Sequence, residues 1–140
     1  MQNPGPTHWK GVKRVITYLD STRDLWLTFS GNTDVLLKGY SDSDWASHAH
    51  RHSISRYSFN YGQGTVSWSL KKQNIIALSS TEAEYIAQTH AAKEGIWLKS
   101  FVNEIRGGEK GPLAIMANNQ GAIALVKDNK FHLRTKHINL

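Results

Sequence analysis

A long helical stripe in the second half of the chain constrains the fold more than any other feature. From Ser79 to about Arg106, apolar residues recur at spacings of three and four, which is typical of one buried helix face. Gly107 and Gly108 follow as a stop signal. The apolar face reads Ala83, Ile86, Ala87, His90, Ala91, Trp97, Leu98, Phe101, Val102 and Ile105. The pattern predicts one long helix with a single buried face.

Strand-like segments precede this helix. Residues 57–61 and 65–69 alternate apolar with polar side chains, and the Gly-Gln-Gly sequence at 62–64 is typical of a hairpin turn. These two segments are expected to pair antiparallel. Residues 35–42 form a short β-type run that ends in an acid, Asp42, and this run is expected to be the central strand.

Helix and strand signals also alternate at the two ends of the chain. Residues 7–19 carry a helical stripe after Pro6, which predicts a first helix. Residues 113–117 form an apolar run that ends at Asn118, and a short helix is expected through residues 122–126. The alternation of the two periods predicts a mixed α/β domain.

Composition favours a soluble, nucleic-acid-binding protein. The net charge is +6 and the isoelectric point is about 9.7, which favours a polyanionic partner because lysine and arginine neutralise phosphates. Solubility alone is the other explanation of this charge. The absence of cysteine excludes disulfides and thiolate metal sites. No apolar run is long enough to cross a bilayer, and the first thirty residues lack a secretory signal, so no membrane partner is expected.

Candidate ligands for a metal ion lie where the expected strands end. Asp42 and Asn118 each follow a strand, and Glu84 lies one turn into the long helix. In open α/β sheets the functional crevice forms beyond the carboxyl ends of the strands. The three oxygen ligands could meet there around Mg2+, which binds few carboxylates together with water and substrate phosphates. From the pattern alone, these residues could equally be ordinary surface carboxylates.

Five blocks of sequence resemble the ribonuclease H domain of copia-type LTR retrotransposon polyproteins. They span roughly 70% of the chain in the order of that family. The blocks are GYSDSDWA at 39–46, VSWSLKKQ at 66–73, ALSSTEAEY at 77–85, NQGAIAL at 119–125 and RTKHI at 134–138. Residues 8–10 and 14–19 resemble the segment that joins the reverse transcriptase domain to the ribonuclease H domain.

The resemblance implies an RNase H-like α/β fold, with a five-stranded mixed sheet flanked by helices and its first three strands antiparallel. Residues 1–34 would be the helix and linker from the reverse transcriptase connection, and residues 35–140 the RNase H-like domain with a truncated C-terminal helix. The implied activity is endonucleolytic cleavage of the RNA strand of RNA/DNA hybrids with two Mg2+ or Mn2+ ions. The reverse transcriptase domain of the same polyprotein would be a partner, and the location would be the cytoplasm, in virus-like particles, or the nucleus.

The resemblance also assigns the site residues. Asp42 matches the metal carboxylate that bridges both ions, and Glu84 matches the helical carboxylate. Glu82 is expected to be structural, because Ser79 and Glu82 have the spacing of a capping box at the helix start. Asp44 falls on the same strand face as Asp42 and is a candidate to support it, as is His137 near the C-terminus.

Two positions depart from the acidic residues of that family. Asn118 and Asn139 stand where the family carries aspartates, so the formal charge of the site falls from minus four to minus two. A neutral amide oxygen can coordinate a cation but contributes no charge, so binding of the second ion should suffer most and the rate should fall by orders of magnitude. The asparagines are either deliberate substitutions or marks of a decayed or repurposed copy. Three further departures favour decay: Arg56 for glycine, Leu70 for serine, and Gly95 within the long helix.

Basic and polar residues near the implied site are candidates for nucleic-acid contacts. They are Lys71, Lys72, Asn119, Gln120, Arg134 and Lys136. Trp68 and Trp97 fall on the expected core stripes and are predicted to pack inside the protein. Two functions from different classes therefore remain: an impaired ribonuclease H, or a noncatalytic module that binds hybrids or serves as a scaffold on the same fold.

Overall fold

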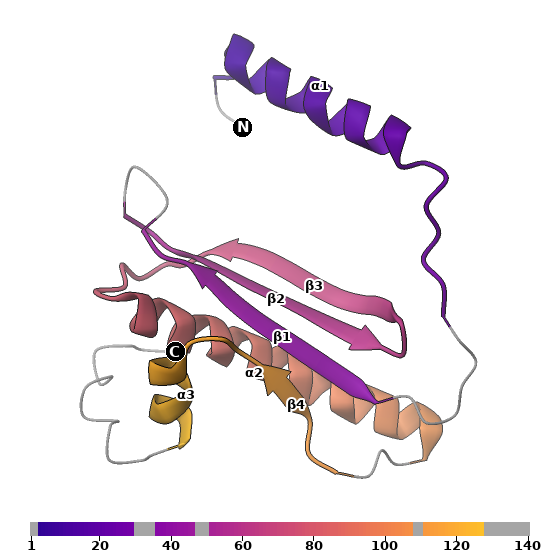
Figure 1. Cartoon of the computed structure of the whole chain (residues 1–140), viewed down its shortest axis with the longest axis vertical. Helices are drawn as coiled ribbons and strands as arrows, with labels where there is room; N and C mark the ends of the chain where they lie inside the picture. Colours follow the sequence, from indigo (N-terminus) through magenta and orange to yellow (C-terminus); the bar gives the residue numbers. More distant parts are fainter. Residues whose placement is uncertain (1–2, 30–35, 47–50, 108–110, 128–140) are drawn as a thin grey trace.

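The computed structural model describes residues 3–29, 36–46, 51–107 and 111–127 (Figure 1). These residues form three helices and four strands. In chain order the elements are α1 Pro6–Ser21, β1 Leu37–Asp44, β2 Ile54–Tyr61, β3 Gly64–Lys72, α2 Ser80–Arg106, β4 Ala114–Met116 and α3 Gln120–Lys127. No helix within these ranges is both long and apolar enough to cross a membrane.

The four strands form one mixed sheet with the order β3-β2-β1-β4. β1, β2 and β3 pair antiparallel, and β4 joins the other edge of β1 in parallel. The mixed α/β class and the central position of the strand that ends in acid are confirmed. The expectation of five strands is wrong for the described part of the chain, which contains four and stops at Lys127.

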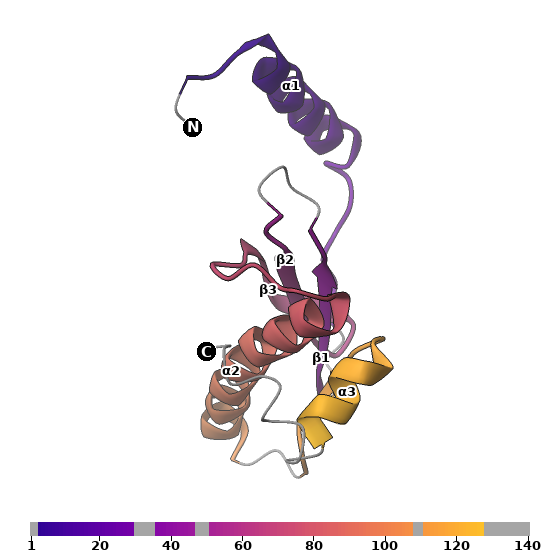
Figure 2. The same ribbon diagram turned by 90° about the vertical axis from the view of Figure 1, so that its left-hand side faces the viewer.

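α2 packs across one face of the sheet, and Figure 2 shows the long helix beside the strands with α3 next to its first half. The ends of α2 are those predicted. Ser79 is the N-cap, and its hydroxyl accepts a hydrogen bond from the Glu82 amide at 3.2 Å. Gly107 ends the helix in the left-handed conformation, with φ of 78°, which glycine adopts without a Cβ clash.

The core is built around Phe59, whose side chain is fully buried. Its ring lies between two glycines, Gly39 on the neighbouring strand and Gly95 on α2. A Cβ on Gly39 would lie 2.5 Å from Phe59 Cε1, and a Cβ on Gly95 would lie 2.5 Å from Leu113 Cδ2 and 3.0 Å from Phe59 Cζ. The two glycines therefore allow the helix and the strand to approach the ring closely.

The predicted burial of α2 is confirmed in its first half, and in its second half it holds for Leu98 but not for Trp97, Phe101 and Ile105. Ala83, Ile86 and Ala87 are buried against the sheet, whereas Trp97 is 57% exposed and Phe101 and Ile105 are exposed as well. Trp97, Phe101 and Ile105 line an open groove between α2 and the β2–β3 hairpin, which leaves them exposed.

Trp68 was also predicted to lie in the core, and it is 73% exposed. In β3 the side chains alternate between the two faces of the sheet. Ser67 faces α2, where its hydroxyl donates to Glu94 Oε1 at 2.6 Å. Trp68 therefore points to the opposite face, which no described helix covers.

α1 lies apart from the sheet (Figure 1). None of its residues is buried, and it contacts no other helix or strand of the described chain. Its apolar stripe, which includes Val12, Val15 and Leu19, is exposed. The chain after α1 returns to the sheet at Phe29, whose ring packs against Gly64 at the start of β3.

Candidate active site

Asp42 and Glu84 come together where the end of β1 meets the first turns of α2. The backbone amide of Ser43 donates a hydrogen bond to Glu84 Oε1 at 3.1 Å, and this bond ties the helix to the strand directly beside Asp42. Glu84 is buried, with 6% of its surface exposed. The two carboxylates predicted from separate elements are thus neighbours.

The pKa of Glu84 is raised above its usual value, first by burial and also by the negative charge of Asp42. The Ser43 amide opposes this shift, because it stabilises the charged form. Glu84 Oε2 is buried and has no hydrogen-bond partner among the described residues. A buried carboxylate oxygen without a donor, next to a second carboxylate, is the arrangement that a cation would complete.

Asn118 follows β4, which is the strand next to β1, near the end of β1 that carries Asp42. In the parallel pairing of β1 with β4, Tyr40 is the partner of Met116. Asp42 and Asn118 each come two residues later, so a continuation of this register brings them side by side. α3 packs closely on the start of α2, since a Cβ on Gly121 would lie 3.1 Å from Thr81 Oγ1. This close packing supports the position of Asn118 just before α3.

The next two predicted residues, Asn119 and Gln120, open α3. Asn119 caps this helix, since its side-chain oxygen accepts a hydrogen bond from the Ala122 amide at 2.9 Å. Its amide nitrogen has no protein partner among the described residues. Gln120 is the exposed first residue of the helix. Both side chains therefore border the position of Asn118.

Arg56 belongs to the site although its sequence pattern did not reveal it. It lies directly opposite Asp42 in the β1–β2 pairing. Its guanidinium is 3.5 Å from Asp42 Oδ2 and 2.7 Å from Asp44 Oδ2. Asp44, predicted to support the metal site, thus forms an ion pair with Arg56. The positive guanidinium beside Asp42 opposes the binding of a cation there.

The described donor set carries little net negative charge for a pair of cations. Asp42 and Glu84 supply two carboxylates, Asn118 is neutral, and Arg56 offsets part of the negative charge. Within the described ranges, no group of three or more histidine, cysteine, aspartate or glutamate side chains could hold a metal ion. Asn139, Arg134, Lys136 and His137 lie outside the described residues.

A buried glutamine holds the elements that carry these side chains. Gln73 is almost fully buried just after β3, and its amide nitrogen donates to Ser55 Oγ at 2.9 Å and to the Ala83 carbonyl at 2.9 Å. The second bond ends at the residue before Glu84. Gln73 therefore joins β2 and β3 to the helical turn that carries the buried carboxylate.

Lys71 and Lys72 end β3 and project to opposite faces of the sheet. Lys71 faces α2, whereas Lys72 follows the face of Leu70 and Trp68. Both are exposed. The two predicted phosphate contacts therefore start from different faces of the sheet.

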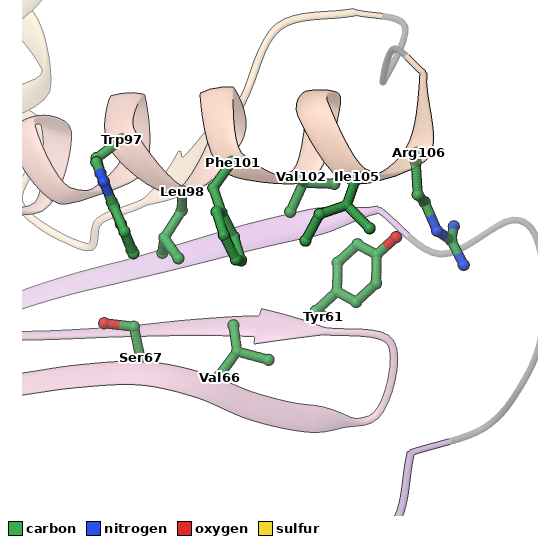
Figure 3. Close-up of a pocket in the computed structure, with 9 residues that line it drawn as sticks. All are labelled: Tyr61, Val66, Ser67, Trp97, Leu98, Phe101, Val102, Ile105 and Arg106. Atoms are coloured by element: carbon green, nitrogen blue, oxygen red, sulfur yellow. The ribbon is translucent and has the colours of Figure 1, made fainter.

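An open apolar groove lies at the other end of α2, between its last turns and the β2–β3 hairpin (Figure 3). Its volume is about 350 Å3. Trp97 and Phe101 stack with ring centroids 5.5 Å apart, and Arg106 lies over the ring of Tyr61 at 5.2 Å. The groove is far along α2 from Glu84 and has no acidic lining residue.

Comparison with known proteins reveals relatives of this chain. No protein-family model matches it, and no solved structure gives a significant match. The chain is 43% identical over 141 residues to the Retrovirus-related Pol polyprotein from transposon TNT 1-94 of Nicotiana tabacum, an alignment that covers 100% of the chain and 10% of the relative. It is 36% identical over 141 residues to the corresponding polyprotein from transposon RE2 of Arabidopsis thaliana, with the same coverage. The chain thus spans about a tenth of the length of these polyproteins.

A further relative is much shorter. The chain is 45% identical over 106 residues to the Secreted RxLR effector protein 161 of Plasmopara viticola, and this alignment covers 75% of each protein. The chain is therefore similar over its whole length to the transposon polyproteins, and over three quarters of its length to a protein of similar size. The chain belongs to the sequence family that these retrovirus-related Pol polyproteins of transposons share with the effector protein.

Proposed function

We propose that this chain is the ribonuclease H segment of a copia-type transposon Pol polyprotein, with RNA/DNA hybrids as substrate and with impaired hydrolysis in this copy. The observation that carries the proposal is the pairing of Asp42 with Glu84 beside Asn118 at the carboxyl end of β1. The Pol polyprotein relatives support the transposon origin.

Asp42, Glu84 and Asn118 would hold Mg2+ or Mn2+, together with Asn139. Two bound ions in such a site stabilise the attacking and leaving oxygens of a phosphodiester. In this chain the residues oppose that occupancy in two ways. Asn118 contributes no charge, and the guanidinium of Arg56 is 3.5 Å from the Asp42 carboxylate. Hydrolysis should therefore be slow because the cation is weakly held.

The nucleic acid would be held by the basic and polar residues around this end of the sheet. Lys72, Gln120 and the amide nitrogen of Asn119 are the described candidates, and Lys71 would serve the α2 face. Arg134, Lys136 and His137 are proposed to contribute from the C-terminal segment. The net charge of +6 favours a phosphate backbone as partner.

Residues 1–34 are proposed to be the end of the connection to a reverse transcriptase domain. The exposed apolar stripe of α1 supports this assignment, since Val12, Val15 and Leu19 have no partner helix or strand in the described chain. An amphipathic helix is stabilised by packing its apolar face on a neighbour. The neighbour would be the preceding domain of the polyprotein.

A noncatalytic hybrid-binding or scaffold module is the second candidate. Two observations favour it. Arg56 already pairs with Asp42 and Asp44, so the acidic end of β1 is partly neutralised without a metal. The effector protein of similar length is 45% identical over 75% of each chain, so a related sequence forms most of a protein that does not carry the name of a Pol polyprotein.

The two candidates separate in a cleavage assay. The chain and its Asn118→Asp/Asn139→Asp variant are incubated with a labelled RNA/DNA hybrid and Mg2+, and hybrid binding is measured in parallel by fluorescence anisotropy. Asp42→Asn on the restored background is the control for a contaminating nuclease. Cleavage of the RNA strand by the restored variant, lost in the control, supports the impaired enzyme.

Other outcomes decide between the remaining alternatives. Binding of the hybrid without cleavage by either protein supports the noncatalytic module. Efficient cleavage by the unmodified chain contradicts the impairment. The absence of both binding and cleavage, in proteins whose circular dichroism melting is cooperative, contradicts both functions.

A further inference from the structure

A polar pocket, separate from the apolar groove, lies between α2 and the edge strand β3 on the α2 face of the sheet. Its volume is about 370 Å3. Lys71 of β3 and His90 and Lys93 of α2 line one part of it, and the hydroxyls of Ser55, Ser69 and Tyr57 line its floor. His90 lies six residues beyond Glu84, about 9 Å along the helix. The pocket shares no residue with the Asp42–Glu84 site.

Two lysines against one glutamate make the charge of this pocket net positive. Neither Lys71 nor Lys93 forms an ion pair with any residue that the structure describes. The pKa of His90 is lowered, first by burial and then by the charges of Lys71 and Lys93. The two ammonium groups therefore act on the same half-buried ring and disfavour its charged form.

Glu94 is the one acidic residue in the lining. Its carboxylate accepts the Ser67 hydroxyl at 2.6 Å, at the end of the pocket away from Lys71. Burial and the charge of Glu94 both raise the pKa of Tyr57, so the phenol keeps its proton and donates it in a hydrogen bond to the Glu94 carboxylate. The carboxylate thus closes one end of the pocket and leaves the cationic end free.

We propose that this pocket binds a phosphate-type oxyanion between Lys71, Lys93 and His90. Charge-assisted hydrogen bonds from the two ammonium groups are the strong contacts for such an anion, and a bound anion would favour the protonated form of His90. The phosphate could belong to a nucleic-acid backbone or to a free small molecule. The proposal does not depend on hydrolysis at Asp42 and Glu84, because the two sites have separate ligands.

The test is an NMR titration of the His90 ring in the full chain. Its signal is assigned by its loss in His90→Asn, and its pKa is measured in inorganic phosphate and in chloride of equal ionic strength. Lys71, Lys93, Glu94 and Tyr57 are the titratable groups around the ring. Because an anion binds the protonated ring more tightly, phosphate should raise the pKa of His90 by roughly half a pH unit.

Paired charge removals give the matched control. Lys71→Gln/Lys93→Gln should weaken phosphate binding roughly tenfold or more, and it should raise the pKa of His90 in chloride. Lys10→Gln/Lys13→Gln removes the same charge from α1 and should leave the phosphate response unchanged. Equal pKa values in phosphate and chloride, or equal losses in the two double variants, would overturn the proposal, provided that circular dichroism reports folded proteins.

Two further ligands distinguish the source of the phosphate. A mononucleotide that shifts the His90 signal as strongly as inorganic phosphate supports a free small molecule. A shift produced by an RNA/DNA hybrid at far lower concentration than by either small anion supports a backbone phosphate. Failure of the hybrid to bind, with a preserved response to inorganic phosphate, would count against the proposed function and leave the oxyanion site intact.

Discussion

Gly39→Ala is a substitution whose cost follows directly from the geometry of the core. The added Cβ would lie 2.5 Å from Cε1 and 3.0 Å from Cζ of the Phe59 ring, which is fully buried. Overpacking of this kind costs about 1–3 kcal/mol. Alanine gains little over glycine in a strand, because both are poor strand formers and the whole strand-propensity scale spans about 1 kcal/mol. The free energy of unfolding should therefore fall by about 1–2 kcal/mol.

The assay is urea unfolding followed by circular dichroism, with Gly11→Ala as the matched control. A Cβ on Gly11 would meet nothing within 4 Å, so this change should be neutral or should favour helix α1. Phe59→Leu tests the cause, because the smaller side chain should relieve part of the Gly39→Ala penalty in a double-mutant cycle. A Gly39→Ala cost below about 0.5 kcal/mol, or additive effects in the cycle, would refute the close-packed arrangement.

Three further substitutions test the elements that carry the site. Ser79→Ala removes the N-cap of α2 and should lower the free energy of unfolding by about 1 kcal/mol. Ser100→Ala, on the exposed side of the same helix, should leave it unchanged. Equal losses of the two variants in urea titrations would argue against the cap. Gln73→Ala should cost about 2–3 kcal/mol, because two buried hydrogen bonds are lost, and a neutral result would contradict that network. The pKa of Glu84 is raised above 4.5 in the folded protein, so above pH 4.5 the folded protein holds a proton that the unfolded chain releases. The free energy of unfolding should therefore fall as the pH rises through the folded pKa. Glu84→Gln should flatten this pH profile, and an unchanged slope would exclude Glu84 as its source.

Local signals predicted the elements well because each depends on a few neighbouring residues. Ser79 and Gly107 mark the two ends of α2 as expected, and Glu82 has the predicted structural role, accepting the Leu78 amide at 2.9 Å. The pairing of Asp42 with Glu84 was anticipated by the family resemblance rather than by periodicity. Neither residue alone carries a signal that distinguishes it from an ordinary surface acid.

Features that depend on register escaped prediction. Arg56 becomes part of the acidic site only because it pairs directly with Asp42 across two strands. Trp68 occupies the outer face because Ser67, not Trp68, faces α2. Gly95 was interpreted from the sequence as a cost to the helix, yet its missing side chain makes room for Leu113 and Phe59. Such contacts link residues far apart in the chain, and helix propensity does not include them.

The most direct test of the site is the affinity for Mn2+, measured from the free-ion signal in electron paramagnetic resonance. The unmodified chain should bind Mn2+ weakly. Arg56→Gly/Asn118→Asp removes one positive charge and adds one negative charge beside Asp42, and it should tighten binding at least about tenfold. Asp42→Asn on that background should abolish the gain. Equally weak binding by all three proteins would contradict a shared cation site formed by Asp42, Glu84 and residue 118.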